Sequence, residues 1–517
     1  MGLAVERVVG AEVGQAADVV DTLGGRMHVR WDANASATPH GQLAYFAQYL
    51  QATQVFERWV NNCPLSRSSG NASAKRDVLG TMVLSVLAGH KRYAHVSALR
   101  GDSVAAQTLG MNKVVSEDTL RRAVASLGQQ PSQEWLQQAL LHSVRPALER
   151  AWIMDIDASV KPLYGHQDGA EVSYNPHKPG RPSHVVHSAI VANLRLVLEC
   201  QLTAGKQHSS AHAKSGIGEL LDRLGPQHRP ALVRGDSGYG NEAILLELEE
   251  REQSYLLRLR QTAGVKTLVK RLFANTDWSA PDAQGCQMVG RSLKLQGWSK
   301  ERRVVVVRQR VRGGIARERR ADTGQGKLDL LPSVHDAGTL LWEYHVLATD
   351  APYPLGAIAQ LYRDRADAEN AFDELKNQWG LLGFNSQQLH CCQTMVRACA
   401  LVYNWWSWYC RAAKPDARME AITSRPLLLA AVGKASNHAN QTMLCLTPLH
   451  AKSRVIKGLI ANIGKALDAI KDAAEQLLHP DPWVRFVRYV CAQIAGPNTI
   501  KPQNLLLAGT GQLLDLG

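Results

Sequence analysis

The chain has 517 residues, more than one compact core usually holds, so we expect about two to four structural units. Apolar residues make up 45% of the chain and charged residues 20%, a balance that excludes a long disordered chain and a fibrous repeat. The formal net charge of +13 favours a polyanionic partner, with nucleic acid as the first candidate.

The nine cysteines contain no CxxC pair, so the sequence indicates neither a disulfide framework nor a zinc site. They are typical of reduced thiols in a cytoplasmic protein. Charged residues interrupt the start of the chain, and nowhere do about 18 apolar residues follow one another. We therefore expect neither an export signal nor a membrane span.

Residues 1–150 are predicted to be mainly helical, after short strands in residues 1–40. Apolar residues recur at helical spacing in 43–62 and 74–90, and Ser and Gly clusters separate the two segments. We expect this region to bind DNA, because the chain is basic and because residues 104–128, within the region, have the outline of a DNA-binding motif.

Residues 104–128 have the outline of a helix-turn-helix. An apolar helix is followed by a break at Gly110, a Ser116 cap and an amphipathic helix. The second helix carries Arg121 and Arg122 and is positioned to enter a major groove. Such helix pairs are often only packing units, and this alternative stays open.

Three apolar or alternating stretches after residue 151 predict three consecutive strands, and a helix and a fourth strand follow. This order is typical of a mixed α/β sheet with helices on its faces. The predicted strands are 152–160, 184–193, 194–204 and 230–236, and the helix is 215–225.

A Gly-punctuated, β-leaning stretch then interrupts the pattern, before a core strand at 341–350 and two strongly periodic helices, 354–379 and 393–412. The second helix carries an aromatic stripe that we expect to be buried. The predicted units are the helical N-terminal region 1–150, a core in two parts (151–262 and 341–412), a β-rich insertion 263–340, and a helical C-terminal region 413–517.

The most informative pattern lies between residues 361 and 379. Four polar side chains fall within about 60° of arc on one side of a single predicted helix. They are Tyr362, Arg365, Glu369 and Lys376. A solvated helix also contains such residues, but this spacing is expected by chance in on the order of one chain in a thousand.

This spacing resembles the Tyr, Arg, Glu, Lys signature of one branch of the DDE transposases of bacterial insertion sequences. That family places its first catalytic aspartate at the end of the first core strand, as in DIDAS (155–159), and the second just past the fourth strand, as in LVRGDSGYG (232–240). The resemblance is clearest from about residue 150 to 410. It implies a ribonuclease H-like catalytic core, DNA strand cleavage and transfer, and a homodimer on paired transposon ends in the bacterial cytoplasm, at the nucleoid.

Three acids match the family's catalytic positions, and they also suit phosphodiester chemistry on their own. Two divalent ions about 3.5–4 Å apart need carboxylates from separate elements, which Asp157, Asp236 and Glu369 supply. Oxygen ligands select Mg²⁺, with Mn²⁺ as a substitute. Such a site contains no covalent nucleophile, so water or a 3′-hydroxyl attacks in line.

Each acid has an alternative. Asp155 lies two residues before Asp157 on the same strand face, and only the small residues that follow favour Asp157. Asp236 precedes Ser and Gly and is also typical of a turn. On the helix, Asp373 lies only about 40° from the face that carries Glu369.

Basic side chains and one phenol around the acids are predicted to contact DNA. Three share the helix face and are expected to reach the phosphates beside the scissile bond: Tyr362, Arg365 and Lys376. The Gly- and Pro-rich loop 164–184 carries Lys178 and Arg181, which would follow a phosphate backbone unless the loop is only a solvated turn.

The insertion holds the densest positive charge. Between residues 281 and 320, eleven Lys and Arg stand against three acids, a net of +8. Arg308, Arg310 and Arg312 are predicted to follow phosphates, although an edge strand also uses such charges against aggregation. Trp298 is expected to stack on a displaced base, with burial in the β unit as the alternative.

The preferred interpretation is a mixed α/β, metal-dependent DNA transposase of the cut-and-paste kind, acting on double-stranded DNA at inverted-repeat ends and at a target. Two alternatives remain. One is a domesticated or inactive relative that only binds DNA, and the other is a metal-dependent nuclease without strand transfer.

Overall fold

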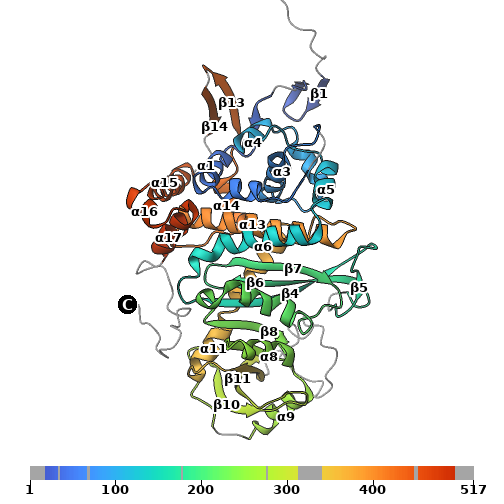
Figure 1. The fold of residues 1–517 in the computed structure, drawn as a ribbon, viewed down its shortest axis with the longest axis vertical. Helices are drawn as coiled ribbons and strands as arrows, with labels where there is room; N and C mark the ends of the chain where they lie inside the picture. Colours follow the sequence, from blue (N-terminus) through green and yellow to red (C-terminus); the bar gives the residue numbers. More distant parts are fainter. Residues whose placement is uncertain are drawn as a thin grey trace, which may run out of the picture.

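The structure is a computed structural model. It describes residues 18–494 apart from 33–34, 67–69, 176–177, 275–276, 313–339, 440 and 448–451. Part of the predicted insertion, 313–339, therefore lies outside the described residues. Figure 1 shows helices in one half of the molecule and a large sheet in the other.

The N-terminal part is helical after three short strands, as predicted. Its elements are β1 (Asp18–Thr22), β2 (Gly25–Val29), β3 (Ala37–Thr38), α1 (Leu43–Thr53), α2 (Val55–Asn61), α3 (Lys75–Leu87), η1 (Tyr93–Leu99), α4 (Ser103–Thr108), α5 (Glu117–Ala125), α6 (Gln129–Val144) and η2 (Arg145–Ala147). The predicted Ser116 cap of α5 is confirmed, because its hydroxyl accepts the backbone N–H of Thr119 at 3.3 Å. Helices α4 and α5 both pack on α3.

A nine-stranded mixed sheet forms the other half, so the mixed α/β prediction is confirmed. Its strands are β4 (Ile153–Pro162), β5 (Glu171–Val172), β6 (Pro182–Val191), β7 (Leu196–Ala204), β8 (Leu232–Gly240), β9 (Tyr255–Leu259), β10 (Gln287–Leu293), β11 (Arg302–Arg312) and β12 (Leu340–Thr349). Their order is β10-β11-β12-β9-β8-β4-β6-β5, and β7 also pairs with β6. Strand β8 is parallel to both β4 and β9, and the other pairs are antiparallel.

Strands β10 and β11 of the predicted insertion continue this sheet beside β12. The edge-strand alternative for the β11 arginines is therefore wrong, because β11 is an inner strand. Its four valines, Val304–Val307, are at most 7% exposed although they alternate between the two faces, so both faces are covered.

The predicted helix 354–379 is two helices, α11 (Leu355–Arg363) and α12 (Ala366–Gln378). They are separated by a tight turn in which the Arg365 N–H donates to the Tyr362 carbonyl at 3.2 Å. The expectation of one continuous helix was wrong, because apolar residues recur at helical spacing on both sides of Asp364 and Arg365 and so do not reveal the break.

Between strands and helices, the sheet carries further short helices. They are η3 (Ala213–Gly218), α7 (Glu219–Leu224), η4 (Pro226–His228), α8 (Glu242–Glu250) and α9 (Ala263–Arg271). The predicted helix 215–225 thus corresponds to the end of η3 and α7.

Helix α13 (Leu389–Ala413) lies between the two halves, with α6 beside it and β7 beneath both (Figure 1). Helices cover one side of α13 and the sheet covers the other, so most of its side chains are buried. The aromatic stripe is confirmed as buried: Tyr403, Trp405, Trp406, Trp408 and Tyr409 are each at most 2% exposed.

The C-terminal part was expected to be helical, but it also contains two strands. It contains α14 (Ala421–Leu428), β13 (Gly433–His438), β14 (Gln441–Leu446), α15 (Ser453–Ala469), α16 (Ala473–Leu478) and α17 (Pro482–Ile494). Strand β13 pairs with β14 and with β3, so the N-terminal and C-terminal parts of the chain share a small sheet. In the described ranges, no helix combines the length and apolar character needed to cross a membrane.

Candidate active site

Two acids lie side by side where the parallel pairing of β4 and β8 ends. The register aligns Ile156 with Gly235, and the next residue on each strand is an acid, Asp157 or Asp236. Residues that are neighbours across two parallel strands point to the same face, so the two carboxylates share one side of the sheet.

The electrostatics of this pair show how close and how enclosed it is. Burial raises the pKa of Asp157 to about 6, the Arg365 guanidinium opposes this rise, and the Asp236 carboxylate adds to it. Lys376 also lies close enough to lower this pKa. Asp157 is therefore a carboxylate that needs a positive partner to stay ionised.

Arg365 connects the third acid to this pair. Its guanidinium is almost fully buried and donates to Asp157 Oδ1 at 3.1 Å and to Glu369 Oε1 at 3.0 Å. It also donates to the Ile156 carbonyl at 3.3 Å. The Glu369 side chain itself is 65% exposed. The structure thus links Glu369 to the pair Asp157 and Asp236 through Arg365, which lies between Asp157 and Glu369.

Asp155 belongs to a different contact. Its two carboxylate oxygens accept hydrogen bonds from Arg234 at 2.7 Å each, and both side chains are at most 1% exposed. Arg234 also donates to the Leu361 carbonyl. This buried bidentate pair engages the Asp155 carboxylate fully, so the geometry favours Asp157 as the reactive acid.

The turn expected as an alternative for Asp236 is present. Asp236 Oδ1 accepts the backbone N–H of Gly238 at 2.9 Å. This bond uses one carboxylate oxygen, so the turn and a role in the site are compatible.

Strand β9 contributes two arginines that the sequence analysis missed. Arg258 donates a hydrogen bond to the half-buried Tyr362, whose pKa is raised by burial. Arg260 donates to the carbonyl of Ser237, next to Asp236, at 3.0 Å. Their alternation at the end of a strand is visible in the sequence, but it belongs to no motif, and only the pairing of β9 with β8 brings them here.

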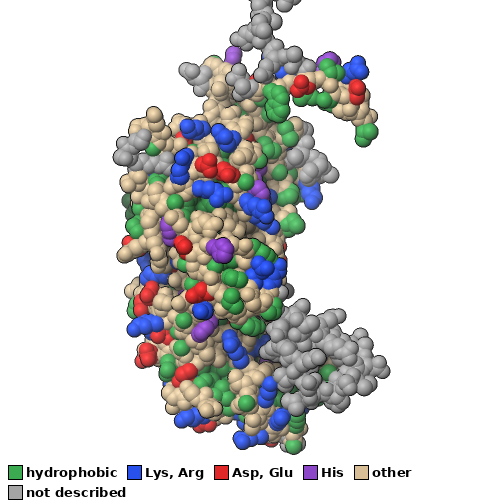
Figure 2. All heavy atoms as spheres, turned by 90° about the vertical axis from the view of Figure 1, so that its right-hand side faces the viewer, with side chains coloured by type: hydrophobic (Ala, Val, Ile, Leu, Met, Phe, Trp, Pro, Cys, Tyr) green, Lys and Arg blue, Asp and Glu red, His purple; other side chains and the backbone are tan. Residues whose placement is uncertain are grey.

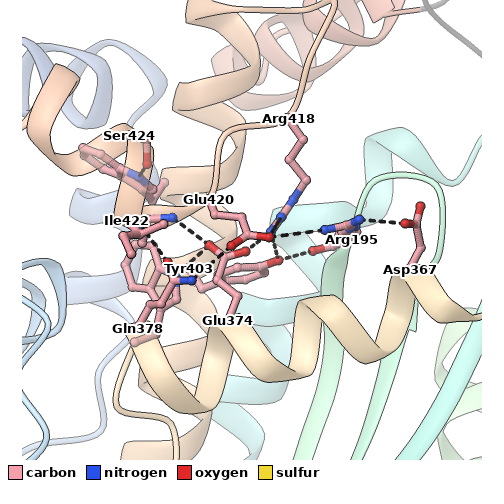
Figure 3. Close-up of polar contacts among 12 residues, drawn as sticks. Arg195, Asp367, Glu374, Gln378, Tyr403, Arg418, Glu420, Ile422 and Ser424 are labelled. Atoms are coloured by element: carbon pink, nitrogen blue, oxygen red, sulfur yellow. Dashed lines mark hydrogen bonds and ion pairs between the residues drawn. The ribbon is translucent and has the colours of Figure 1, made fainter. Parts of the chain in front are cut away.

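The opposite side of α12 is anchored by Glu374, which is 2% exposed (Figure 3). Its carboxylate accepts hydrogen bonds from Arg418 and from the Ala421 backbone N–H, the latter at 3.0 Å. At the start of α12, Asp367 accepts a hydrogen bond from Arg195 at 2.7 Å. These contacts hold α12 against α14 and the β6–β7 turn. They therefore fix the position on α12 from which Glu369 projects.

The predicted DNA-contacting residues outside this cluster lie in separate places. In the loop before β6, Lys178 and Arg181 are exposed and flank the ring of Tyr164, with Nζ 4.9 Å and Cζ 4.5 Å from its centroid. On α5, Arg121 and Arg122 are also exposed.

The arginines of β11 are largely engaged within the fold. The Arg308 guanidinium lies between Trp278 and Trp342, at 4.0 and 4.4 Å from the ring centroids. Arg310 lies 5.0 Å from the ring of Trp342. Arg312 ends β11, and its side chain lies outside the described part of the chain.

Trp298 is buried, as the alternative for this residue proposed. It is 8% exposed and lies under the Arg302 guanidinium, which pairs with Glu242 and Glu249 at 2.6 and 2.7 Å. Stacking on a base would require Trp298 to leave the core. Part of the positive charge of this segment is therefore neutralised inside the fold.

Comparisons with known proteins place the chain in a family. A family model described as "Transposase DDE domain group 1" matches residues 37–467. Among curated proteins, no match was found. A solved structure of piggyBac transposase, in a synaptic complex with hairpin DNA, aligns over 89% of this chain and 85% of that chain, with 10% identity and a TM-score of 0.36. Because this family model matches most of the chain, the chain belongs to the DDE transposases.

Proposed function

We propose that the protein is a cut-and-paste transposase that cleaves DNA at transposon ends and transfers the ends to a target. Asp157, Asp236 and Glu369 are its catalytic residues. The observation that supports this most directly is the pair of carboxylates at the end of the β4–β8 pairing, joined to Glu369 through Arg365. DDE transposases generally depend on divalent metal ions.

The three acids fit such a metal. Their donor set is entirely oxygen, which suits Mg²⁺ and also Mn²⁺. Burial and the neighbouring Asp236 both raise the pKa of Asp157, a cost that a cation would relieve. Within the described residues, no three His, Cys, Asp or Glu side chains converge tightly enough to hold an ion, because Glu369 is turned to Arg365. Two ions per site are proposed, held by Asp157, Asp236 and Glu369.

When bound, divalent ions lower the pKa of water and stabilise charge on the phosphate oxygens. The chain's own residues then orient the DNA. Tyr362 and Lys376 contact the phosphates beside the scissile bond, and Arg258 adds a further positive charge on the β9 side. Arg365, which is almost fully buried, orients Asp157 and Glu369 beneath these phosphates. The buried Arg234 and Asp155 pair holds β4 and β8 in register beneath the acids.

The wider assembly is proposed on the same basis. The strand order β7-β6-β4-β8-β9, with its last three strands parallel, supports a ribonuclease H-like core. We propose that the protein acts as a homodimer on paired inverted-repeat ends, in the cytoplasm of a bacterium at the nucleoid. The exposed basic residues Lys178, Arg181, Arg121 and Arg122 would contact double-stranded DNA.

The first test removes each acid in turn. Asp157→Asn, Asp236→Asn and Glu369→Gln should each reduce cleavage of an end-bearing duplex at least about a thousandfold, while the affinity for that duplex stays within about threefold. Asp373→Asn is the matched control, because this acid lies exposed on the same helix and bonds to Asn377 at 2.7 Å. An acid variant that still cleaves normally would remove that residue from the site.

A second assay separates a transposase from a simple nuclease. Pre-cleaved ends are incubated with a supercoiled target plasmid and Mg²⁺, and joined products are measured. A transposase gives joined products and a nuclease gives none. An inactive DNA-binding relative would bind the ends but neither cleave nor join them.

A further inference from the structure

A cavity of about 180 Å³ lies between α5 and the start of α13, away from the three acids. The cavity is several times larger than the roughly 30 Å³ that a water molecule occupies in the liquid. It therefore has room for a group the size of a phosphate. Its lining comes from three segments that are far apart in the sequence. The lining residues are Tyr93, Arg121, Arg122, Ala125, Ser386 and Cys391.

Two guanidinium groups give this cavity its charge. The Arg121 guanidinium lies 4.5 Å from the ring centroid of Tyr93, which is 2% exposed and so provides a fixed support. Neither Arg121 nor Arg122 forms an ion pair with an acid of the described chain, although Glu117 and Asp118 lie one turn earlier on the same helix. Two unpaired guanidinium groups at one cavity favour an anion as their partner.

Other parts of the protein stand beside α5 on the side that carries its two arginines. The end of α5 is covered by α13, where His390 Nε2 lies 3.3 Å from the Ala125 carbonyl. The cavity wall opposite the arginines is formed by Ser386 and Cys391 of the same segment. A helix that enters a major groove needs its contacting face free of other protein elements.

The cavity lies on the same side of the molecule as the basic loop before β6. The backbone N–H of Asp168 in that loop donates to the Gln387 carbonyl at 2.8 Å, one residue from the cavity wall. The loop carries the exposed Lys178 and Arg181. Figure 2 views this side and shows Lys and Arg side chains along its length. The loop backbone thus lies against the segment that forms one wall of the cavity, on a face where Lys and Arg side chains are mixed with acidic ones.

We propose that this cavity binds one phosphate group of the DNA backbone, through Arg121, Arg122 and the Ser386 hydroxyl. The proposal rests on the proposed function for the presence of DNA. It assigns Arg121 and Arg122 to holding the backbone irrespective of sequence, in place of reading base edges.

The test compares Arg121→Gln and Arg122→Gln with Arg145→Gln, a matched control whose exposed side chain lies at the far end of the 16-residue α6. The affinity of each protein for an end-bearing duplex and for an unrelated duplex is measured against salt concentration. Each cavity variant should bind both duplexes more weakly by a similar factor. The slope of log affinity against log salt should fall by about 0.9 for each lost phosphate contact. Arg145→Gln should leave the slope unchanged.

Three outcomes would overturn the proposal. A loss confined to the end-bearing duplex would show base reading, and an unchanged slope in a folded variant would show that no phosphate binds in the cavity. Arg121→Gln also loses its stacking on Tyr93, so Arg122→Gln is the decisive variant if the first one unfolds at lower temperature. Stabilisation by inorganic phosphate that Arg122→Gln removes, with duplex binding unchanged, would assign the cavity to free phosphate and overturn the DNA proposal.

Failure of the proposed function is a separate result. Wild-type protein that shows the expected cavity-dependent slope but does not cleave DNA would contradict the transposase assignment and leave the cavity proposal standing. If the wild type cleaves DNA and the variants show unchanged slopes, the cavity proposal is contradicted and the transposase assignment stands.

Discussion

Asp155 and Asp157 show how far residue spacing can be used to assign a role. Both acids lie on β4, two residues apart, and their spacing alone does not separate them. The structure separates them by their partners: Arg234 engages both oxygens of Asp155, whereas Asp157 lies beside Asp236 and accepts a single bond from Arg365. Arg234 is distant in the sequence, so its pairing could not be predicted.

A buried pair that loses one charge leaves the other charge unpaired. Asp155→Asn should therefore lower the free energy of unfolding by about 3–5 kcal/mol, measured by urea denaturation. Cleavage per folded molecule should stay close to wild type, because Asp155 makes no contact with the other acids. A variant with normal stability and no cleavage would instead place Asp155 in the reaction.

Asp157 should show the opposite effect on stability. Its pKa is raised from 3.8 to about 6 in the folded protein, so the folded state favours the protonated carboxyl. The contribution of this protonation to the free energy of unfolding is fully present below about pH 4 and is lost as pH rises through 6. In a buffer with chelator at pH 7 to 8, the free energy of unfolding of Asp157→Asn should be about 1–3 kcal/mol higher than that of wild type.

This gain should disappear below about pH 4, where wild-type Asp157 is protonated as well. Thermal unfolding of both proteins across pH 3 to 8 measures the difference. A variant that is less stable than wild type at every pH would contradict the raised pKa.

At the scale of elements, the strands and helices that carry the acids could be predicted, but their connection could not. The predicted helices 74–90 and 393–412 match α3 and α13, whereas the helical segment 43–62 is divided into α1 and α2 at Gln54, and 354–379 into α11 and α12 near Arg365. Periodicity detects which residues face the core, and both helices present the same spacing. The break matters because it places Arg365 before α12, where its side chain reaches Asp157 and Glu369 together.

Arg365 makes contacts that only a planar guanidinium can make. Arg365→Ala should reduce cleavage by about tenfold to a hundredfold, in line with the loss of one or two charged hydrogen bonds, and Arg365→Lys should recover little of it. Single-turnover cleavage at saturating protein measures this effect. Full recovery by lysine would mean that positive charge alone is needed at this position.

At the scale of the whole molecule, long-range pairing accounts for what the sequence analysis left out. The predicted N-terminal and C-terminal regions are joined by β3 and β13, and the backbone bridge between His40 and Ala431 lies in the same place. The predicted insertion contributes β10 and β11 to the main sheet. Such contacts connect residues from tens to hundreds of positions apart, and no local pattern encodes them.

Direct metal binding tests the central claim that three acids form a divalent metal site. Mn²⁺ binding is measured by calorimetry or electron paramagnetic resonance on wild type, Asp157→Asn, Asp236→Asn, Glu369→Gln and the control Asp373→Asn, each with an end-bearing duplex present. Wild type and the control should bind Mn²⁺ alike, and each acid variant should bind at least about tenfold more weakly. Equal Mn²⁺ affinity in wild type and the three acid variants would contradict the account.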